Sequence, residues 1–159
     1  MKILLTGSSG FIGQRLRPRL EKLGVVYDLK SDLTDHISVT EEVKTVKPDI
    51  IVHLAARTEV QESFYEQITF TEVNYVGTVN LIEACRNVNP MPYFVFASTM
   101  EVYGWQPISD EVEKTGTYTN KVAFDENTIP HPNAPYAVAK YGCEKYLEYA
   151  HRSYGLPFT

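Results

Sequence analysis

Residues 2–13 read Lys-Ile-Leu-Leu-Thr-Gly-Ser-Ser-Gly-Phe-Ile-Gly, an apolar run that leads directly into three glycines spaced three apart. A short, unbroken apolar run is typical of a strand buried on both faces of a parallel sheet. Gly7 permits a tight turn, Gly10 lets a phosphate approach the backbone, and Gly13 lets the next helix pack closely. The free N–H groups of that helix would face the pyrophosphate. The stretch predicts a dinucleotide-binding turn; a purely structural turn is the alternative.

Short apolar runs and helical patterns alternate along the rest of the chain. The further runs that read as strands are Val25–Leu29, Asp49–Ala56 and Tyr93–Ser98. Helical spacing of apolar residues falls around residues 16–23, 39–46, 69–88 and 135–153. This alternation predicts an α/β fold, a Rossmann-like doubly wound parallel sheet with helices on both faces. Leu156–Thr159 reads as the start of another strand, so we expect residues 1–159 to form one dinucleotide-binding domain whose C-terminal partner is missing.

Composition limits the classes of partner. The chain has 159 residues, 43% of them hydrophobic, which suits one domain with a core. Its net charge of −5 disfavours nucleic-acid and anionic-membrane surfaces. No apolar run reaches the roughly 18 residues of a membrane span, and the glycine cluster comes too early for a secretory signal. Cys85 and Cys143 fit no metal or redox spacing. A cytoplasmic protein without a bound metal is expected.

An acidic residue follows the second strand. Asp28 lies 15 residues after Gly13, where a carboxylate can accept hydrogen bonds from the adenosine ribose and repel a 2′-phosphate. This favours NAD as the cofactor. Arg15 and Lys30 are nearby cations that could accommodate the 2′-phosphate of NADP, which is therefore the less favoured cofactor. The alternative for Asp28 is a solvated aspartate in a turn.

Tyr136 and Lys140 are four residues apart on a predicted helix, which places both side chains on one face. A tyrosine with a pKa of about 10 is a poor base, but a neighbouring ammonium group lowers that pKa. The phenol could then exchange a proton with a sugar hydroxyl or carbonyl. The alternative is a pair on the helix surface. Thr99 and the adjacent Ser98 follow the Tyr93 strand, and ligands of open α/β sheets lie at the carboxyl ends of strands.

These motifs, in this order, resemble the extended short-chain dehydrogenases/reductases, specifically the NAD-dependent nucleotide-sugar epimerases and dehydratases. The resemblance covers essentially the whole chain. It implies that Thr99 is the catalytic hydroxyl, with Ser98 the less favoured alternative, and that Lys140 also binds the nicotinamide ribose. Its members are roughly twice as long, and their connection before the catalytic helix is shorter than Gly104–Pro135 here, so extra residues are expected within 105–122.

The resemblance also assigns residues to the cofactor. The pyrophosphate turn comprises Gly7, Gly10, Phe11, Ile12 and Gly13, while Asp32 and Leu33 hold the adenine and Leu54, Ala55 and Ala56 pass beside the cofactor. Asn74 matches a helix motif near the site; packing of that helix against the sheet is the equally weighted alternative. Only three residues separate Asp28 from Asp32, where relatives place a helix and a strand. A shortened crossover and a trimmed sheet edge are therefore expected.

Glu101 bears on the reaction class. Sugar 4,6-dehydratases of this kind carry Thr-Asp-Glu before Val-Tyr-Gly, whereas here Met100 replaces the aspartate. A methionine cannot ionise, which counts against a two-acid dehydratase. A Thr-x-Glu pattern resembles that of GDP-mannose dehydratases and UDP-glucuronate decarboxylases. Glu101 is thus a candidate base at the sugar C5 position, or a polar residue tolerated in an epimerase.

Together these features predict an NAD-dependent epimerase or dehydratase that transiently oxidises C4 of a nucleotide sugar. Tyr136 would take the C4 hydroxyl proton, Thr99 would steady the oxygen, and Lys140 would keep the phenol basic. The alternative is a non-catalytic dinucleotide-binding module or an inactive fragment. Which nucleotide and which sugar bind, and whether the reaction is epimerisation, dehydration or decarboxylation, stay open. Relatives commonly form homodimers through the helices that carry Asn74 and Tyr136.

Overall fold

The computed structural model describes residues 1–104 and 124–159. Within them four parallel strands form one sheet in the order β2-β1-β3-β4. The strands are β1 (Lys2–Thr6), β2 (Val25–Asp28), β3 (Ile50–His53) and β4 (Tyr93–Phe96). Three of them begin where the sequence predicted, β3 begins one residue later, and the last three end one to three residues earlier. The extra residues expected within 105–122 lie outside the described part of the chain.

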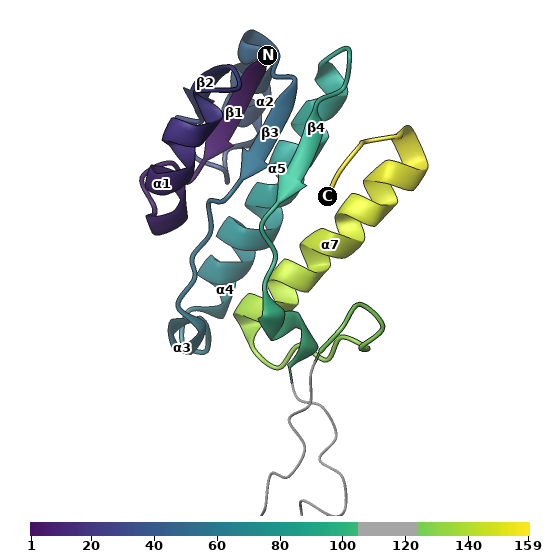
Figure 1. Cartoon of the computed structure of the whole chain (residues 1–159). Helices are drawn as coiled ribbons and strands as arrows, with labels where there is room; N and C mark the ends of the chain where they lie inside the picture. Colours follow the sequence, from purple (N-terminus) through teal and green to yellow (C-terminus); the bar gives the residue numbers. More distant parts are fainter. Residues whose placement is uncertain (105–123) are drawn as a thin grey trace, which may run out of the picture.

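Helices cover both faces of the sheet, as the α/β pattern predicted (Figure 1). On one face, Ile3, Leu5 and Val52 pack against leucines of α1 (Phe11–Leu20). On the other, Leu4 and Ile51 belong to a larger core with α2 (His36–Val46), α5 (Gly77–Ala84) and α7 (Pro135–Tyr154). Neighbouring residues of one strand thus point to opposite, buried faces, which explains why the strand sequences are continuously apolar.

The sheet edge beside β2 is short, as expected from the spacing of Asp28 and Asp32. No strand stands between β2 and α2 in this described region; residues 29–35 lead directly from one to the other. Asp35 begins α2, because its carboxylate accepts hydrogen bonds from the N–H groups of Ile37 and Ser38. The connection between β2 and α2 is therefore a single loop, and its last residue, Asp35, caps the helix.

Residues 69–88, predicted as one helix, are four consecutive helical segments. These are α4 (Gln67–Phe70), a π-helical turn η1 (Thr71–Val76), α5, and a 3-10 turn (Cys85–Asn87). The π-helical turn carries Asn74, which is 1% exposed. A β-carbon at Gly77 would stand 2.8 Å from Cβ of Leu33, so a glycine lets this helix approach the trimmed crossover. Wide turns of this kind are frequent at functional sites.

The position predicted for the last helix is confirmed, since α7 begins at Pro135 and ends one residue beyond the predicted Ser153. Gly155 adopts a left-handed conformation, with φ of 78°, that terminates the helix. The following segment turns back along β4, where Phe158 pairs in parallel with Phe94. The expected further strand is thus present as an isolated bridge at the sheet edge next to α7 (Figure 1).

Candidate functional site

The three glycines of the first turn differ in how close an added β-carbon would come to neighbouring atoms. Gly7 has φ of 70°, and a β-carbon there would stand 2.7 Å from the backbone nitrogen of Ala55. A β-carbon on Gly13 would lie 2.1 Å from the carbonyl oxygen of Gly7. Gly10 is different: its nearest neighbour would be 3.3 Å away. Gly7 and Gly13 are therefore required by the fold, whereas Gly10 leaves an open surface at the start of α1.

The N-terminus of α1 has no side-chain cap, in contrast to α2. It opens into a cleft of about 600 Å³ at the carboxyl ends of β1 and β3. Most of the predicted cofactor residues line this cleft, namely Gly7, Gly10, Phe11, Ile12, Gly13, Leu54, Ala55 and Ala56. Uncapped N–H groups beside an open glycine form the type of cradle that a pyrophosphate fills.

Asp28, Asp32 and Leu33 do not line the glycine cleft. The Asp28 carboxylate is paired with the guanidinium of Arg17, and both lie in a separate groove along the edge of β2. Asp32 is exposed and accepts hydrogen bonds from the backbone and hydroxyl of Thr34, which lower its pKa. Leu33 is buried in the core. Their roles in binding the adenosine stay predictions.

Arg57, Thr58, Val73 and Ala97 complete the cleft wall, and sequence reasoning did not single them out. Arg57 is held firmly: its guanidinium pairs with Glu62 and Glu66 and lies 5.0 Å from the ring centroid of Phe70. Its backbone N–H donates to the side-chain oxygen of Asn74, whose amide donates back to the Arg57 carbonyl. Asn74 thus fixes the cleft segment rather than simply packing its helix on the sheet.

Tyr136 and Thr99 come together from α7 and from the loop after β4. The Thr99 hydroxyl is close enough to the phenol to lower its pKa, and it accepts the N–H of Glu101. Burial raises the pKa of Tyr136, the Thr99 hydroxyl partly opposes the rise, and the charge of Glu101 adds to it. Ser98 is turned away, because its hydroxyl donates to Glu144. Of the two candidate hydroxyls, Thr99 is therefore the one in contact with the phenol.

Lys140 is 3% exposed, and burial lowers its pKa to about 8. Its ammonium group donates to the carbonyl of Ala97 over 2.7 Å. The causes of the Tyr136 shift do not include Lys140, so the lowering of the phenol pKa by this lysine stays a prediction. The helical spacing places both residues on the same buried side of α7, but the ammonium group is directed to the strand end.

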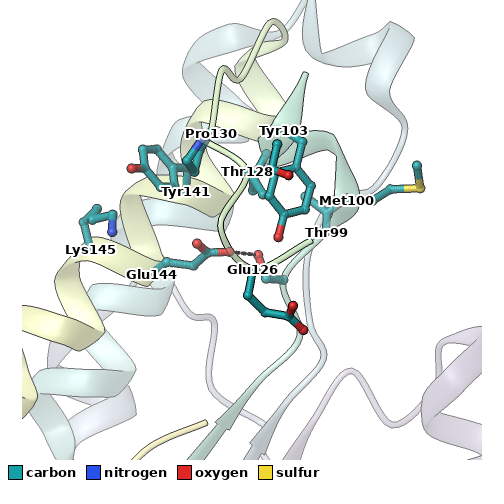
Figure 2. Close-up of a pocket in the computed structure, with 11 residues that line it drawn as sticks. Thr99, Met100, Tyr103, Glu126, Thr128, Pro130, Tyr141, Glu144 and Lys145 are labelled. Atoms are coloured by element: carbon teal, nitrogen blue, oxygen red, sulfur yellow. Dashed lines mark hydrogen bonds between the residues drawn. The ribbon is translucent and has the colours of Figure 1, made fainter. Parts of the chain in front are cut away.

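A second hollow, also of about 600 Å³, is lined by Ser98 and Thr99, whereas Ala97 just before them lines the glycine cleft. Figure 2 shows residues that line this hollow, among them Tyr141, Glu144 and Lys145 of α7 and Glu126, Thr128 and Pro130 of the loop before it, with a dashed line from the Glu144 carboxylate. The Met100 side chain, 68% exposed, points outward. This hollow and the glycine cleft therefore flank the Thr99 loop.

Comparison with known proteins identifies this arrangement. The sequence model of the NAD dependent epimerase/dehydratase family matches residues 3–159. The chain belongs to the NAD-dependent epimerase/dehydratase family. This family membership confirms the resemblance inferred from the motifs, and with it the Rossmann-like architecture.

Relatives within the family include both reaction types. The chain is 32% identical to a dTDP-D-glucose 4,6-dehydratase of Dictyostelium discoideum, over 98% of this chain and 42% of that protein. It matches the structure of a Thermus thermophilus UDP-glucose 4-epimerase in complex with NAD at a TM-score of 0.83 and 29% identity, covering 99% of this chain and 53% of that one. It also matches the structure of a dTDP-glucose 4,6-dehydratase from Streptomyces venezuelae with NAD bound. That match has a TM-score of 0.81 and 26% identity, and it covers 99% of this chain and 54% of that one. The chain thus spans about half the length of these relatives.

Two further structural facts bear on partners. None of the helices in the described part of the chain is long and apolar enough to cross a membrane. Within residues 1–104 and 124–159, no group of three or more His, Cys, Asp or Glu side chains is placed to hold a metal ion.

Proposed function

We propose that this chain carries the NAD-binding and proton-transfer machinery of a nucleotide-sugar epimerase or dehydratase. The observation that supports it most is the approach of the Thr99 hydroxyl to the Tyr136 phenol, close to the glycine cleft at Ala97. The pair adjoins the cleft through Ala97, which lines the cleft wall and accepts the bond from Lys140. A binding module without catalysis would not require a buried phenol, hydroxyl and ammonium group at this place.

The cleft suits a dinucleotide. The uncapped start of α1 and the open face of Gly10 would hold the pyrophosphate, and the Leu54–Ala56 segment would pass beside it. NAD, when bound, supplies the hydride acceptor and donor. NAD is preferred over NADP because the Asp28 carboxylate would repel a 2′-phosphate, although Arg17 lies against it.

Residues of the chain itself would carry out the proton transfer. The Thr99 hydroxyl can donate to the Tyr136 oxygen, because it already accepts the Glu101 N–H. A sugar C4 hydroxyl bound between the two would lose its proton to the phenol oxygen as its carbon is oxidised. Lys140, once bound to the ribose hydroxyls, would bring its positive charge nearer to the phenol and lower the raised pKa of Tyr136.

The presence of Glu101 favours dehydration, which is a lyase reaction, over epimerisation, which is an isomerase reaction. Its charge contributes to the raised pKa of Tyr136, so the carboxylate lies near the phenol that would bind the sugar. From there it could take a proton at C5, next to the oxidised C4. Met100, which is exposed and has no ionisable group, cannot supply the second acid of the two-acid dehydratases. Analysis of the product of a nucleotide-sugar substrate distinguishes the two reactions.

The assembly and location are part of the same proposal. Val76 of η1 and Val138 of α7 are 41% and 55% exposed, on the two helical segments through which relatives are expected to dimerise. A homodimer would cover them. Cys85 and Cys143 are both free and buried, which fits the reducing cytoplasm.

Calorimetric titration of the chain with NAD, followed by addition of UDP- or dTDP-glucose, tests the proposal. The expected result is NAD binding that is tighter than NADP binding, and a nucleotide sugar that changes the near-ultraviolet absorbance of the nicotinamide. NAD binding without any such change would favour the non-catalytic module. A chain that binds no dinucleotide would refute both readings.

A further inference from the structure

His53, the last residue of β3, is a fully buried histidine that the proposed chemistry does not use. It is 1% exposed and lies against the rings of Phe94 and Phe96, with centroids 5.9 and 6.0 Å away. Both ring nitrogens have partners: Nδ1 lies 2.6 Å from Oγ1 of Thr6 and Nε2 lies 2.9 Å from Oγ1 of Thr78. The imidazole therefore joins the ends of β1 and β3 to α5.

The protons of this chain of hydrogen bonds can be assigned from its ends. The Thr6 hydroxyl oxygen accepts the backbone N–H groups of Leu54 and Ala55, at 3.1 and 3.0 Å. Its own proton is thus free to go to Nδ1 of His53, which leaves the imidazole proton on Nε2 to be donated to Thr78. Thr78 in turn donates to the Asn74 carbonyl over 2.6 Å. Every donor is used, with a neutral imidazole in the centre.

The neutral state agrees with the surroundings. Burial, and after it the charge of Lys140, lower the pKa of His53 to about 3. A protonated ring would have to donate from Nδ1 towards Thr6, whose oxygen already accepts two N–H groups. The hydrogen bonds and the lowered pKa therefore favour the same neutral tautomer.

Both ends of the chain of bonds terminate on the wall of the glycine cleft. At one end Thr6 holds the N–H groups of Leu54 and Ala55, which line the cleft. At the other end Asn74, anchored by Thr78, makes two bonds to the backbone of Arg57, which also lines it. Hydrogen bonds from Thr6 and Asn74 thereby fix the segment from residue 54 to 57 at its beginning and its end.

We propose that His53 is a positioning residue for the cofactor, which holds the 54–57 wall of the cleft in its binding conformation through Thr6 and Thr78. The inference rests on the proposed binding of NAD in this cleft. A wall that is already ordered loses less conformational entropy when the dinucleotide binds, so the hydrogen bonds act on affinity as well as on stability.

Thr78→Val tests this, with Thr40→Val as a matched control. Both substitutions replace a buried helical threonine by its isostere, but the Thr40 hydroxyl has no hydrogen-bond partner in the described structure. Thr78→Val is expected to weaken NAD binding about tenfold, as loss of one buried hydrogen bond to the wall would. Thr40→Val should leave the affinity unchanged. Equal affinities in the two variants, well below their unfolding temperatures, would overturn the proposal.

Substitutions of His53 itself separate positioning from mere filling of the core. His53→Asn keeps an acceptor near Thr6, whereas His53→Leu keeps none. Partial recovery of NAD affinity in the asparagine variant relative to the leucine variant supports the proposal. A leucine variant that binds NAD like the unmodified chain contradicts it.

Amide hydrogen exchange without any ligand keeps the inference separate from the proposed function. In Thr78→Val and His53→Leu, exchange at the N–H groups of Ala55 and Arg57 should be about tenfold faster than in Thr40→Val. A chain that binds no NAD but shows this pattern would refute the proposed function and retain the positioning of the wall. Unchanged exchange at both amides in a folded variant would refute the positioning.

Discussion

Lys140 is bonded to the backbone of Ala97 rather than to the phenol of Tyr136. Its ammonium group donates over 2.7 Å to that carbonyl and lies 4.7 Å from the ring centroid of Phe96. One hydrogen bond and one aromatic face replace only part of the hydration that a free ammonium group would have. The lysine therefore carries a buried charge at some cost, which is why its pKa falls to about 8.

The lowered pKa of Lys140 predicts how stability changes with pH. The unfolded lysine keeps its proton up to about 10.5, whereas the folded one begins to lose it near 8. Between these values the unfolded state binds more protons, so this group makes the folded state relatively more stable as the pH rises. Urea unfolding at several pH values from 7 to 10.5 should show this contribution in the unmodified chain compared with Lys140→Met.

The comparison with Lys140→Met is needed because other groups titrate in the same range. The phenols of Tyr146 and Tyr154 have raised pKa values, because burial disfavours the charged phenolate. Groups of this kind make the folded state less stable as the pH rises. These contributions are common to both proteins and cancel in the difference of their unfolding free energies. A difference that stays constant from pH 7 to 10.5 would show that the lysine is not buried as a cation.

The closeness of the Tyr136 phenol to the Thr99 hydroxyl predicts a separation of binding from turnover. Tyr136→Phe removes the oxygen that exchanges the proton and should lower turnover by about 10²- to 10⁴-fold in a protein that acts on a nucleotide sugar. NAD affinity should change less than about twofold, since the ring still fills its place. Tyr141→Phe, on the exposed hollow of the same helix, is the control and should keep full activity. Equal turnover in the two variants would remove Tyr136 from the mechanism.

Much of this arrangement was readable from the sequence because the relevant signals are local. Strand ends, the glycine turn and the 136–140 spacing depend on neighbouring residues and on simple periodicity. The direction of the Lys140 ammonium group was not readable, because it depends on the carbonyl of a strand 43 residues earlier. Nor was the split of the 69–88 helix, where Asn74 reaches the Arg57 backbone 17 residues away. His53 was visible in the sequence only as a polar residue inside the predicted Asp49–Ala56 strand.

The glycine turn predicts opposite outcomes for two alanine substitutions. At Gly13 an added β-carbon would stand 2.1 Å from the Gly7 carbonyl, so Gly13→Ala should destabilise the fold by about 3 kcal/mol or more. At Gly10 the β-carbon meets nothing closer than 3.3 Å and the backbone is extended, with φ of −75°. Gly10→Ala should therefore lower the unfolding free energy by no more than about 1 kcal/mol, since the Gly7 carbonyl has to shift only slightly and alanine is a poorer N-cap than glycine, and it should block the pyrophosphate. Thermal unfolding and NAD titration of both variants measure the contrast; a Gly10→Ala chain with full NAD affinity would place the phosphates elsewhere.

The pairing of Asp28 with Arg17 leads to the last prediction, on cofactor preference. A half-exposed ion pair contributes at most about 1 kcal/mol, so a ribose can displace it at little cost. Arg17→Gln should therefore change NAD affinity less than about fivefold, while NADP loses a cation close to its 2′-phosphate. Asp28→Asn removes both the acceptor for the ribose and the repulsion of the phosphate, so the ratio of NAD to NADP affinity should fall. Parallel titrations with the two cofactors measure this ratio. If Asp28→Asn leaves it unchanged, Asp28 serves only to hold α1 against the edge of the sheet.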